Sequence, residues 1–402
     1  MHSDPTGTTS ALHVSEAELQ SSFRVEAAKG TNGKRMHTAT LFLGGDVMTG
    51  RGIDQILPRP SDWRLFERMV HDAREYVALA EHQSGPIPHT VDARYIWGDA
   101  LEELDRVKPD ARIINLETSV TRSNDPWPHK AVRYRMHPAN TPCLTSAGIH
   151  VCILANNHVM DWGRAGLVET IETLHAAGIK SAGAGRSLAE AWQPAIVESV
   201  RGTRFVIIGL GDPSSGIPPE WAATERSAGV ALLEDFATST ADKVAETIQR
   251  HRGPGSIAVA SIHWGPNWGY DVAPSHARFA HALIDRGIDI VHGHSSHHPR
   301  PIEIYRKKLI LYGCGDFIDD YEGIAGYEEF RDDLALMYFP TVHPGSGELI
   351  ELRMVGLRIR KMRLERVSRQ DAGWLHAVLG RESRPHGTKI IISNTNDLLV
   401  SV

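Results

Sequence analysis

An apolar run that ends in a cluster of histidines is the feature that most constrains the fold of this chain. Ile288, Ile290 and Val291 form the run, and four histidines follow within seven positions, from His292 to His298. A short apolar run bounded by glycine and proline is typical of a buried strand. In open α/β sheets, ligands and catalytic groups lie just beyond the carboxyl ends of such strands. The cluster therefore indicates a functional site, and the alternative is a polar loop that happens to be rich in histidine.

The same pattern, a short apolar run that ends in polar side chains, recurs along the chain. The runs that we interpret as strands are 38–43, 111–116, 151–155, 257–262 and 308–312. The polar side chains that follow them are Asp46, Glu117, Asn156, Asn157, His158, His263 and Asp316. Helical periodicity between the runs predicts an α/β fold with helices on the sheet faces. We expect the strand ends to form one shared site, and the stretch 121–136, rich in Pro, Trp and Arg, to pass over it.

Length and periodicity predict how the chain is divided. Its 402 residues exceed the usual size of one domain. We expect a partly disordered leader at 1–37, a catalytic domain at 38–366, and a C-terminal helix and tail at 367–402 that pack on it. The runs 336–340 and 349–359 alternate apolar and polar residues, which predicts an antiparallel pair at a sheet edge. Helical spacing over 62–82 predicts a helix that spans this segment.

Composition excludes several classes of protein. A formal net charge of −6 without a basic stripe argues against a nucleic-acid partner. No stretch approaches the ~18 to 20 apolar residues that span a bilayer, and 1–37 lacks an apolar signal core. The three cysteines, an odd number without zinc-type spacing, suit a reducing compartment. We therefore expect a cytoplasmic protein that contacts neither nucleic acid nor membrane.

The residue types at the strand ends indicate a metal site. Carboxylate and amide oxygens suit Mg, Ca or Mn, whereas imidazole suits Zn, Fe or Mn. Carboxylates that gather at one place repel one another unless a cation lies between them. We expect one divalent metal ion (Ca, Mn, Mg or Zn) and no organic cofactor.

Histidines beside acids are also suited to proton transfer near neutral pH. His158 and Asp161, three residues apart, form one candidate pair. The second pair is His294 or His297 with one of the acids Asp46, Asp316 and Asp319, and the sequence leaves the partner open.

Several motifs together resemble a known family. They are Gly-Gly-Asp-Val-Met-Thr-Gly-Arg, Asn-Leu-Glu-Thr, Ala-Asn-Asn-His-Val-Met-Asp-Trp-Gly, His-Trp-Gly, Gly-His-Ser-Ser-His-His-Pro and Tyr-Gly-Cys-Gly-Asp-Phe. In this order they resemble the capsule-synthesis CapA type of calcineurin-like metallophosphoesterase, over residues 38–365. The resemblance implies a four-layer sandwich of two mixed sheets flanked by helices. It also implies a metal site formed by Asp46, Glu117, Asn157, His158, His263, His294 and His297.

Three positions depart from the pattern of that family. Met48 stands where the wider family has a histidine ligand, and Glu117 is the nearest equivalent of its bridging aspartate. These departures favour a single metal with free histidines over a two-metal centre. Asp316 stands where the CapA pattern has asparagine, which adds an acid.

Three functions compete. The chain resembles the cytosolic CapA-like enzymes of lasso-peptide biosynthesis, which invert the Cα of the C-terminal residue, a tryptophan in the known case, of a ribosomal precursor peptide. This resemblance implies a metal-dependent peptide epimerase that acts on the precursor peptide C-terminus, and it is the function we favour. Its proton-transfer residues are His158, Asp161, His294, His297, Asp46 and Asp316. The alternatives are a CapA-like metallophosphoesterase or poly-gamma-glutamate capsule-type hydrolase or transferase, and a binding module without catalysis.

An anionic, apolar substrate end requires a cation and aromatic walls. Arg51, Arg133 and Arg135 are the candidates for binding its carboxylate, although a solvated surface charge is the default for an arginine. Trp264 and Trp268 lie close after His263 and are the best candidates for the walls. For the other tryptophans and for Tyr321, ordinary packing is the default interpretation.

Overall fold

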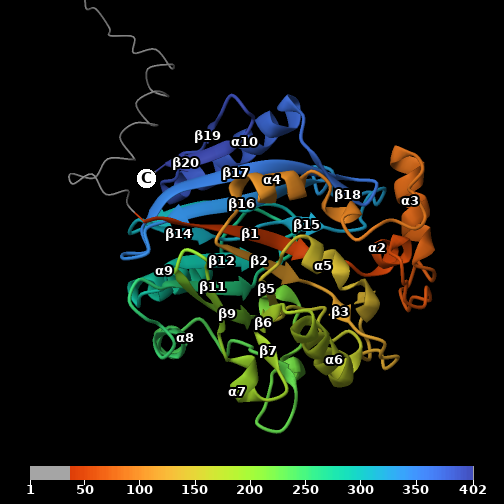
Figure 1. The fold of residues 1–402 in the computed structure, drawn as a ribbon, viewed down its shortest axis with the longest axis horizontal. Helices are drawn as coiled ribbons and strands as arrows, with labels where there is room; N and C mark the ends of the chain where they lie inside the picture. The colour runs from red at the N-terminus through yellow and green to blue at the C-terminus, as the bar shows by residue number, and fades with distance from the viewer. Residues whose placement is uncertain (1–36, 402) are drawn as a thin grey trace, which may run out of the picture. The chain divides into compact units, whose positions relative to one another are not determined.

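The computed structural model describes residues 37–401. Two sheets form the centre of the fold (Figure 1). The predicted leader therefore lies outside the described residues, except for its last position. The larger sheet has the order β19-β20-β17-β16-β1-β2-β5-β6, with β15 beside β1 and β18 beside β17. The smaller sheet has the order β13-β14-β12-β11-β9-β8.

The strands of the larger sheet are β1 (Ala39–Val47), β2 (Ala111–Leu116), β5 (Val151–Ile153), β6 (Lys180–Ala182), β15 (Asp316–Ile318), β16 (Leu334–Val342), β17 (Leu349–Arg360), β18 (Arg363–Arg366), β19 (Ile391–Ile392) and β20 (Leu398–Ser401). Those of the smaller sheet are β8 (Ala195–Glu198), β9 (Arg204–Gly211), β11 (Ile257–His263), β12 (Ile290–His294), β13 (Ile302–Tyr305) and β14 (Lys308–Leu311). Two further pairs join β3 (Ser119–Val120) to β4 (Arg135–Met136) and β7 (Ala184–Gly185) to β10 (Gly229–Val230).

The helices are α2 (Arg51–Ile56), α3 (Arg74–Ser84), α4 (Ala100–Val107), α5 (Pro142–Ser146), α6 (Gly163–Ala176), α7 (Leu188–Ala191), α8 (Thr238–Gln249), α9 (Pro274–Asp285) and α10 (Arg369–Ser383). None of the helices within residues 37–401 combines the length and the apolar character needed to cross a bilayer.

Apolar side chains on both faces of the two sheets produce four layers. In β1, Phe42 packs in a core cluster with α2 to α6, whereas Leu41 and Leu43 pack in a second cluster that joins the sheets. Successive side chains of a strand point to opposite faces, so one apolar strand serves both clusters. A third cluster, which includes Val244 of α8 and Phe279 of α9, covers the outer face of the smaller sheet. The layers are helices, sheet, sheet and helices, which is the calcineurin-like sandwich that the motifs imply.

Parallel pairing places the functional strand ends together. β1, β2 and β5 are parallel to one another, as are β9, β11 and β12. Their carboxyl ends carry the polar residues that the sequence singled out. The two sheets meet there, because His292 Nε2 at the end of β12 lies 3.0 Å from the carbonyl oxygen of Gly44 in β1.

Two predictions about the scaffold are wrong. The segment 62–82 is not one helix, because α3 begins only at Arg74. Asp62 and Asp72 accept hydrogen bonds from nearby backbone N–H groups, a local alternative to helical bonding. The antiparallel pair β16–β17 is present but is not at an edge, since β1 pairs with β16 and β20 pairs with β17.

Candidate metal centre

Asp46 is presented at the end of β1 by the two glycines that precede it. A Cβ at Gly45 would lie 1.8 Å from the carbonyl oxygen of Gly315, so only glycine permits this approach of the two backbones. Asp46 is fully buried, and its carboxylate accepts hydrogen bonds from Asn115 Nδ2 at 2.8 Å and from the backbone N–H of Ser295 at 3.1 Å. Ser295 has φ of 102°, a strained conformation directly after β12 that accompanies this contact.

His263 and His294 end the neighbouring strands β11 and β12 in register with one another. Their Nδ1 atoms lie 2.8 Å apart, and both side chains are fully buried. Together with Asp46 they bring three donor atoms within 4.8 Å of one another, the one such group among the described residues.

Hydrogen bonds determine which nitrogen of each imidazole carries the proton. His292 Nε2 faces the carbonyl of Gly44 and must donate to it, so His292 Nδ1 accepts from the Ser261 hydroxyl at 2.9 Å. The Ser261 oxygen then accepts from His294 Nε2 at 3.0 Å, which leaves a lone pair on His294 Nδ1. His263 Nε2 lies 3.2 Å from Asn157 Oδ1 and donates to it, which leaves a lone pair on His263 Nδ1 as well.

Two lone pairs facing one another beside a carboxylate favour a positive charge between them. Burial lowers the pKa of both imidazoles, which disfavours a protonated histidine as that charge. Burial, and then the nearby Asp316, raises the pKa of Asp46 to about 7. A divalent ion bound by one carboxylate and two imidazoles satisfies all three groups, so the residues fit the expected metal.

His158 and Asp161 form a second feature beside this centre. His158 Nδ1 lies 2.6 Å from Asp161 Oδ2, and that oxygen also accepts the backbone N–H of Tyr134 at 2.7 Å. Lys130 Nζ lies 2.6 Å from the other oxygen of Asp161. Burial lowers the pKa of His158 to about 4, so the imidazole is neutral at pH 7 with a lone pair on Nε2. That nitrogen lies 3.8 Å from Glu117 Oε1.

His297 and Asp316 form the other histidine–acid pair. His297 Nδ1 lies 2.9 Å from Asp316 Oδ1, and His297 Nε2 lies 2.8 Å from Asn267 Nδ2. Asp316 is in register with Asp46 across the parallel strands β15 and β1. Of the alternatives that the sequence left open, the structure therefore selects Asp316 as the partner of His297.

Comparisons with known proteins support the resemblance. Residues 40–321 match the family described as "Bacterial capsule synthesis protein PGA_cap". The chain belongs to the PGA_cap family. A "Probable polyglutamine synthesis accessory protein" of Mycobacterium tuberculosis is 50% identical over 90% of this chain and 95% of its own length. The "Capsule biosynthesis protein CapA" of Bacillus anthracis is 24% identical over 78% of this chain and 67% of its own. TT1561 of Thermus thermophilus, a solved structure, covers 78% of this chain and 97% of its own at a TM-score of 0.37 and 8% identity.

Four of the seven ligands expected for this PGA_cap chain lie outside the group of three donors. Glu117 accepts a hydrogen bond from Asn115 at 3.2 Å, and Asn157 binds His263. His158 and His297 are held by acids instead. Met48, at the position of the missing histidine ligand, is buried with its sulfur 3.5 Å from the Tyr321 hydroxyl. The four expected ligands Glu117, Asn157, His158 and His297 thus surround the centre, and their role as ligands stays a prediction.

The substrate-binding residues expected from the sequence are placed differently. Trp264 packs in the outer cluster, stacked on His276 with its indole N–H bound to the carbonyl of Tyr312, and does not line a substrate pocket. The reason is strand alternation: His263 points inward, so the next side chain points outward. Trp268, in contrast, lies 5.3 Å from the ring of His297.

The arginines expected to bind a carboxylate already have partners. Arg51 donates from Nε to Asp320 at 3.2 Å and from Nη1 to the Tyr76 hydroxyl at 2.9 Å, and it is buried. Arg133 donates to the carbonyl of Trp127 at 2.7 Å, and Arg135 to that of Ser123 at 2.8 Å. A substrate role for these arginines stays a prediction that competes with their present contacts.

Lys130 and Tyr134 are the site residues that the sequence analysis missed. Both belong to the segment 121–136, which was expected to pass over the site, and both contact Asp161. The composition of the segment marked it as unusual, but nothing in the sequence paired Lys130 with an acid 31 positions later.

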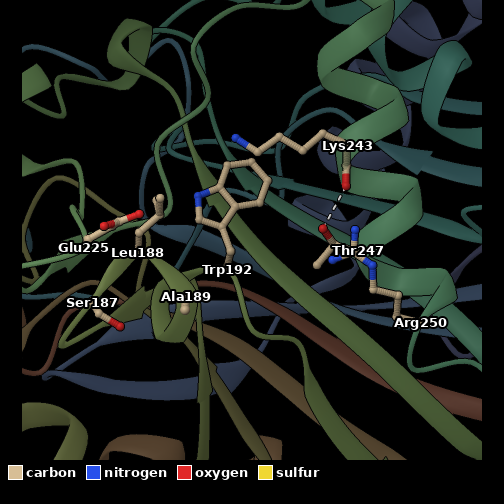
Figure 2. Close-up of a pocket in the computed structure, with 8 residues that line it drawn as sticks. All are labelled: Ser187, Leu188, Ala189, Trp192, Glu225, Lys243, Thr247 and Arg250. Carbon is tan, nitrogen blue, oxygen red and sulfur yellow. Dashed lines mark hydrogen bonds between the residues drawn. The ribbon is translucent and has the colours of Figure 1, made fainter.

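Two cavities lie outside the group of three donors. One, of about 460 Å³, lies between α7 and α8, where Lys243 Nζ is 4.3 Å from the ring centre of Trp192 (Figure 2). None of the predicted site residues lines it. The other, of about 260 Å³, is lined by Asp319 and Tyr321 and adjoins the His297–Asp316 pair through β15.

Proposed function

We propose that this chain is a metal-dependent enzyme in the synthesis of a polyglutamine or polyglutamate polymer, and that it hydrolyses or transfers amide bonds of that polymer. The observation that carries the proposal is the convergence of two imidazole lone pairs and a carboxylate, from His263, His294 and Asp46, next to the neutral His158. The names of the relatives, an accessory protein of polyglutamine synthesis and a capsule biosynthesis protein, supply the polymer class.

The residues of the chain suit this chemistry. Asp46, His263 and His294 would hold a divalent ion, which would supply Lewis acidity to the carbonyl group of the amide. His158 Nε2 accepts a proton from the attacking water or amine, because Asp161 holds the ring in the tautomer with the proton on Nδ1. Lys130 and the N–H of Tyr134 hold Asp161 in place beside the imidazolium formed in that step.

The test is amide turnover on defined polymers. Purified protein with added Mn²⁺ or Zn²⁺ is incubated with polyglutamine and poly-gamma-glutamate oligomers, and the products are separated by mass spectrometry. Shorter oligomers or new amide conjugates are expected, with loss of both on chelation and in His263→Ala. Turnover of a generic aryl phosphate without any change in the oligomers would contradict the proposal in favour of a phosphoesterase.

A second candidate, the peptide epimerase, is favoured by one observation. Two histidine–acid pairs, His158–Asp161 and His297–Asp316, adjoin the same centre, and inversion at a Cα requires one group to remove a proton and another to return one. The names of the relatives do not support this activity. It predicts deuterium uptake at the C-terminal Cα of a peptide in heavy water with no amide released, which separates it from the first candidate.

A further inference from the structure

The cavity of about 260 Å³ beside β15 contains acids whose charges are not balanced. Five carboxylates line it: Asp319, Glu322, Glu328, Asp332 and Asp333. Its two arginines, Arg331 and Arg358, lie 2.7 Å and 3.0 Å from Asp333, and Arg331 also binds Asp371 at 2.8 Å. Both cations therefore serve Asp333 and its neighbour, and the other four acids form no ion pair within residues 37–401.

Asp319 is the acid that most requires a partner. It is 1% exposed, and one carboxylate oxygen accepts the backbone N–H of Tyr321 at 2.8 Å. The second oxygen is buried and has no hydrogen-bond partner among the described residues. A buried carboxylate oxygen without a partner, on a residue that lines a cavity, is costly unless a ligand completes it.

The surrounding charges make a cationic ligand the favourable one. Burial raises the pKa of Asp319, and neighbouring Asp316 raises it further. Burial and then Asp333 raise the pKa of Asp332. Within residues 37–401, neither Asp319 nor Asp332 has a lysine, arginine or histidine in salt-bridge contact, and Asp316 has only His297. A bound positive charge would relieve this repulsion.

The spacing of these acids distinguishes between kinds of cation. A dehydrated metal ion needs ligand atoms at about 2.0 to 2.6 Å, which brings them close to one another. Among the described residues, three donor atoms converge within 4.8 Å only at Asp46, His263 and His294. Asp316, Asp319 and Asp332 form no such group of three, whereas an ammonium group needs only two carboxylate partners, at N–H···O distances of about 2.7 to 2.9 Å.

We propose that this cavity binds the primary ammonium group of an amino acid or of a peptide N-terminus, with Asp319 and Asp332 as its anionic partners and Tyr321 beside it. The inference rests on the proposed function and deepens it. The ring centre of Tyr321, which lines the cavity, lies 5.4 Å from that of His297, and Asp316, the partner of His297, is in register with Asp46, so the amine would lie near the metal centre. A polymer-synthesis enzyme has to place such an amine beside the amide that it transfers.

Binding rather than turnover tests this inference. Isothermal titration calorimetry on the full chain compares L-glutamine and triglutamine with their N-acetylated forms, which lack the ammonium charge. A comparison of the two free amines with one another distinguishes a free amino acid from a peptide N-terminus as the ligand. We expect at least one free amine to bind, neither acetylated form to bind, and the affinity to fall at least about tenfold in Asp319→Asn, from the loss of a charge-assisted hydrogen bond. Asp332→Asn, at a half-exposed position, provides a second variant if Asp319→Asn does not fold. Asp242→Asn on α8 changes the net charge equally and should bind as the wild type does.

Each other outcome overturns the inference. Equal binding of the acetylated forms, no binding of either free amine, or unchanged affinity in Asp319→Asn and Asp332→Asn would show that no ammonium subsite exists. Loss of a second bound Ca²⁺ or Mn²⁺ per chain in Asp319→Asn would show a metal site instead. The same titration is made with His263→Ala, which should lose amide turnover if the proposed function is right. Amine binding that persists in this variant shows that the ammonium site exists independently of the proposed function.

Discussion

His263 Nδ1 lies 2.8 Å from His294 Nδ1, and the hydrogen bonds of both rings leave a lone pair on each of these nitrogens. Two lone pairs at this distance repel one another. The parallel register of β11 and β12 imposes the contact, so the fold itself holds the repulsion in place. A cation between the rings would relieve this repulsion, which is why we assign a candidate metal centre here.

Metal binding should therefore stabilise the folded protein. Zn²⁺ or Mn²⁺ at 100 times its Kd is expected to raise the free energy of unfolding by about 2.7 kcal/mol, because the ion binds only the folded chain. Chemical denaturation with and without the ion measures this. His263→Ala should abolish the increase, whereas His175→Ala, at an exposed position of α6, should keep it. An increase that is unchanged in His263→Ala would place the ion elsewhere.

The His158–Asp161 pair should affect turnover without affecting the metal. Asp161→Asn removes the acceptor that fixes the tautomer of His158, so kcat for amide turnover is expected to fall about 10²-fold or more. Metal content measured by atomic emission should stay at the wild-type level. If His158→Ala lost the metal together with the activity, His158 would be a ligand, as the family resemblance implies.

His298 should contribute a stability that increases with pH between pH 4 and pH 6.5. Burial lowers the pKa of His298 to about 4, its Nε2 lies buried without a hydrogen-bond partner, and the ordinary pKa is about 6.5. The unfolded chain binds more protons in this window, so stability rises with pH there, by up to about 3 kcal/mol from this group.

Urea denaturation at several pH values compares His298→Gln with the wild type. The variant should show a weaker pH dependence between pH 4 and 6.5, and His175→Gln should behave as the wild type. An identical slope in His298→Gln would mean that its imidazole titrates normally in the folded state.

The buried pair of Arg51 and Asp320 should contribute strongly to stability. Both side chains are almost fully buried, and Asp320 also accepts the backbone N–H of Gly52 at 2.8 Å. Arg51→Met leaves Asp320 charged and unpaired, at an expected cost of about 3 to 5 kcal/mol.

The matched control is Arg64→Met, whose partner Asp62 lies at the surface and whose side chain is 71% exposed. The loss of unfolding free energy in Arg64→Met should stay within about 0.5 kcal/mol in the same denaturation experiment. A small loss in Arg51→Met would show that Arg51 is free enough to serve a substrate carboxylate.

The scaffold could be predicted from the sequence where apolar runs were short and bounded. The run 111–116 coincides with β2, because a short apolar run between turn signals has few other solutions. The two-residue strands β3, β4, β7 and β10 carry no such pattern, and they form only because tertiary contacts bring them together. The segment 62–73 has a helical pattern but forms no helix. Its apolar residues Phe66 and Met69 are 56% and 84% exposed, so they do not form a buried helix face.

The sequence predicted which residues belong to the site but not which of their side chains bind one another. Strand ends placed Asp46, His263 and His294 together because parallel strands finish at one edge. Which acid holds which histidine depends on register, for example that of Asp316 with Asp46, and no local pattern specifies it. Lys130 was missed for the same reason. The outward direction of Trp264 follows from strand alternation, which was predictable once His263 was placed facing inward.

Anomalous diffraction from crystals grown with Mn²⁺ or Zn²⁺ tests the central claim most directly. We predict one strong anomalous peak within coordination distance of Asp46, His263 and His294, and no such peak at these residues in His294→Ala. A peak held by other residues, or none at saturating metal in a structure that keeps the 2.8 Å contact of the two Nδ1 atoms, would contradict the assignment of the metal centre.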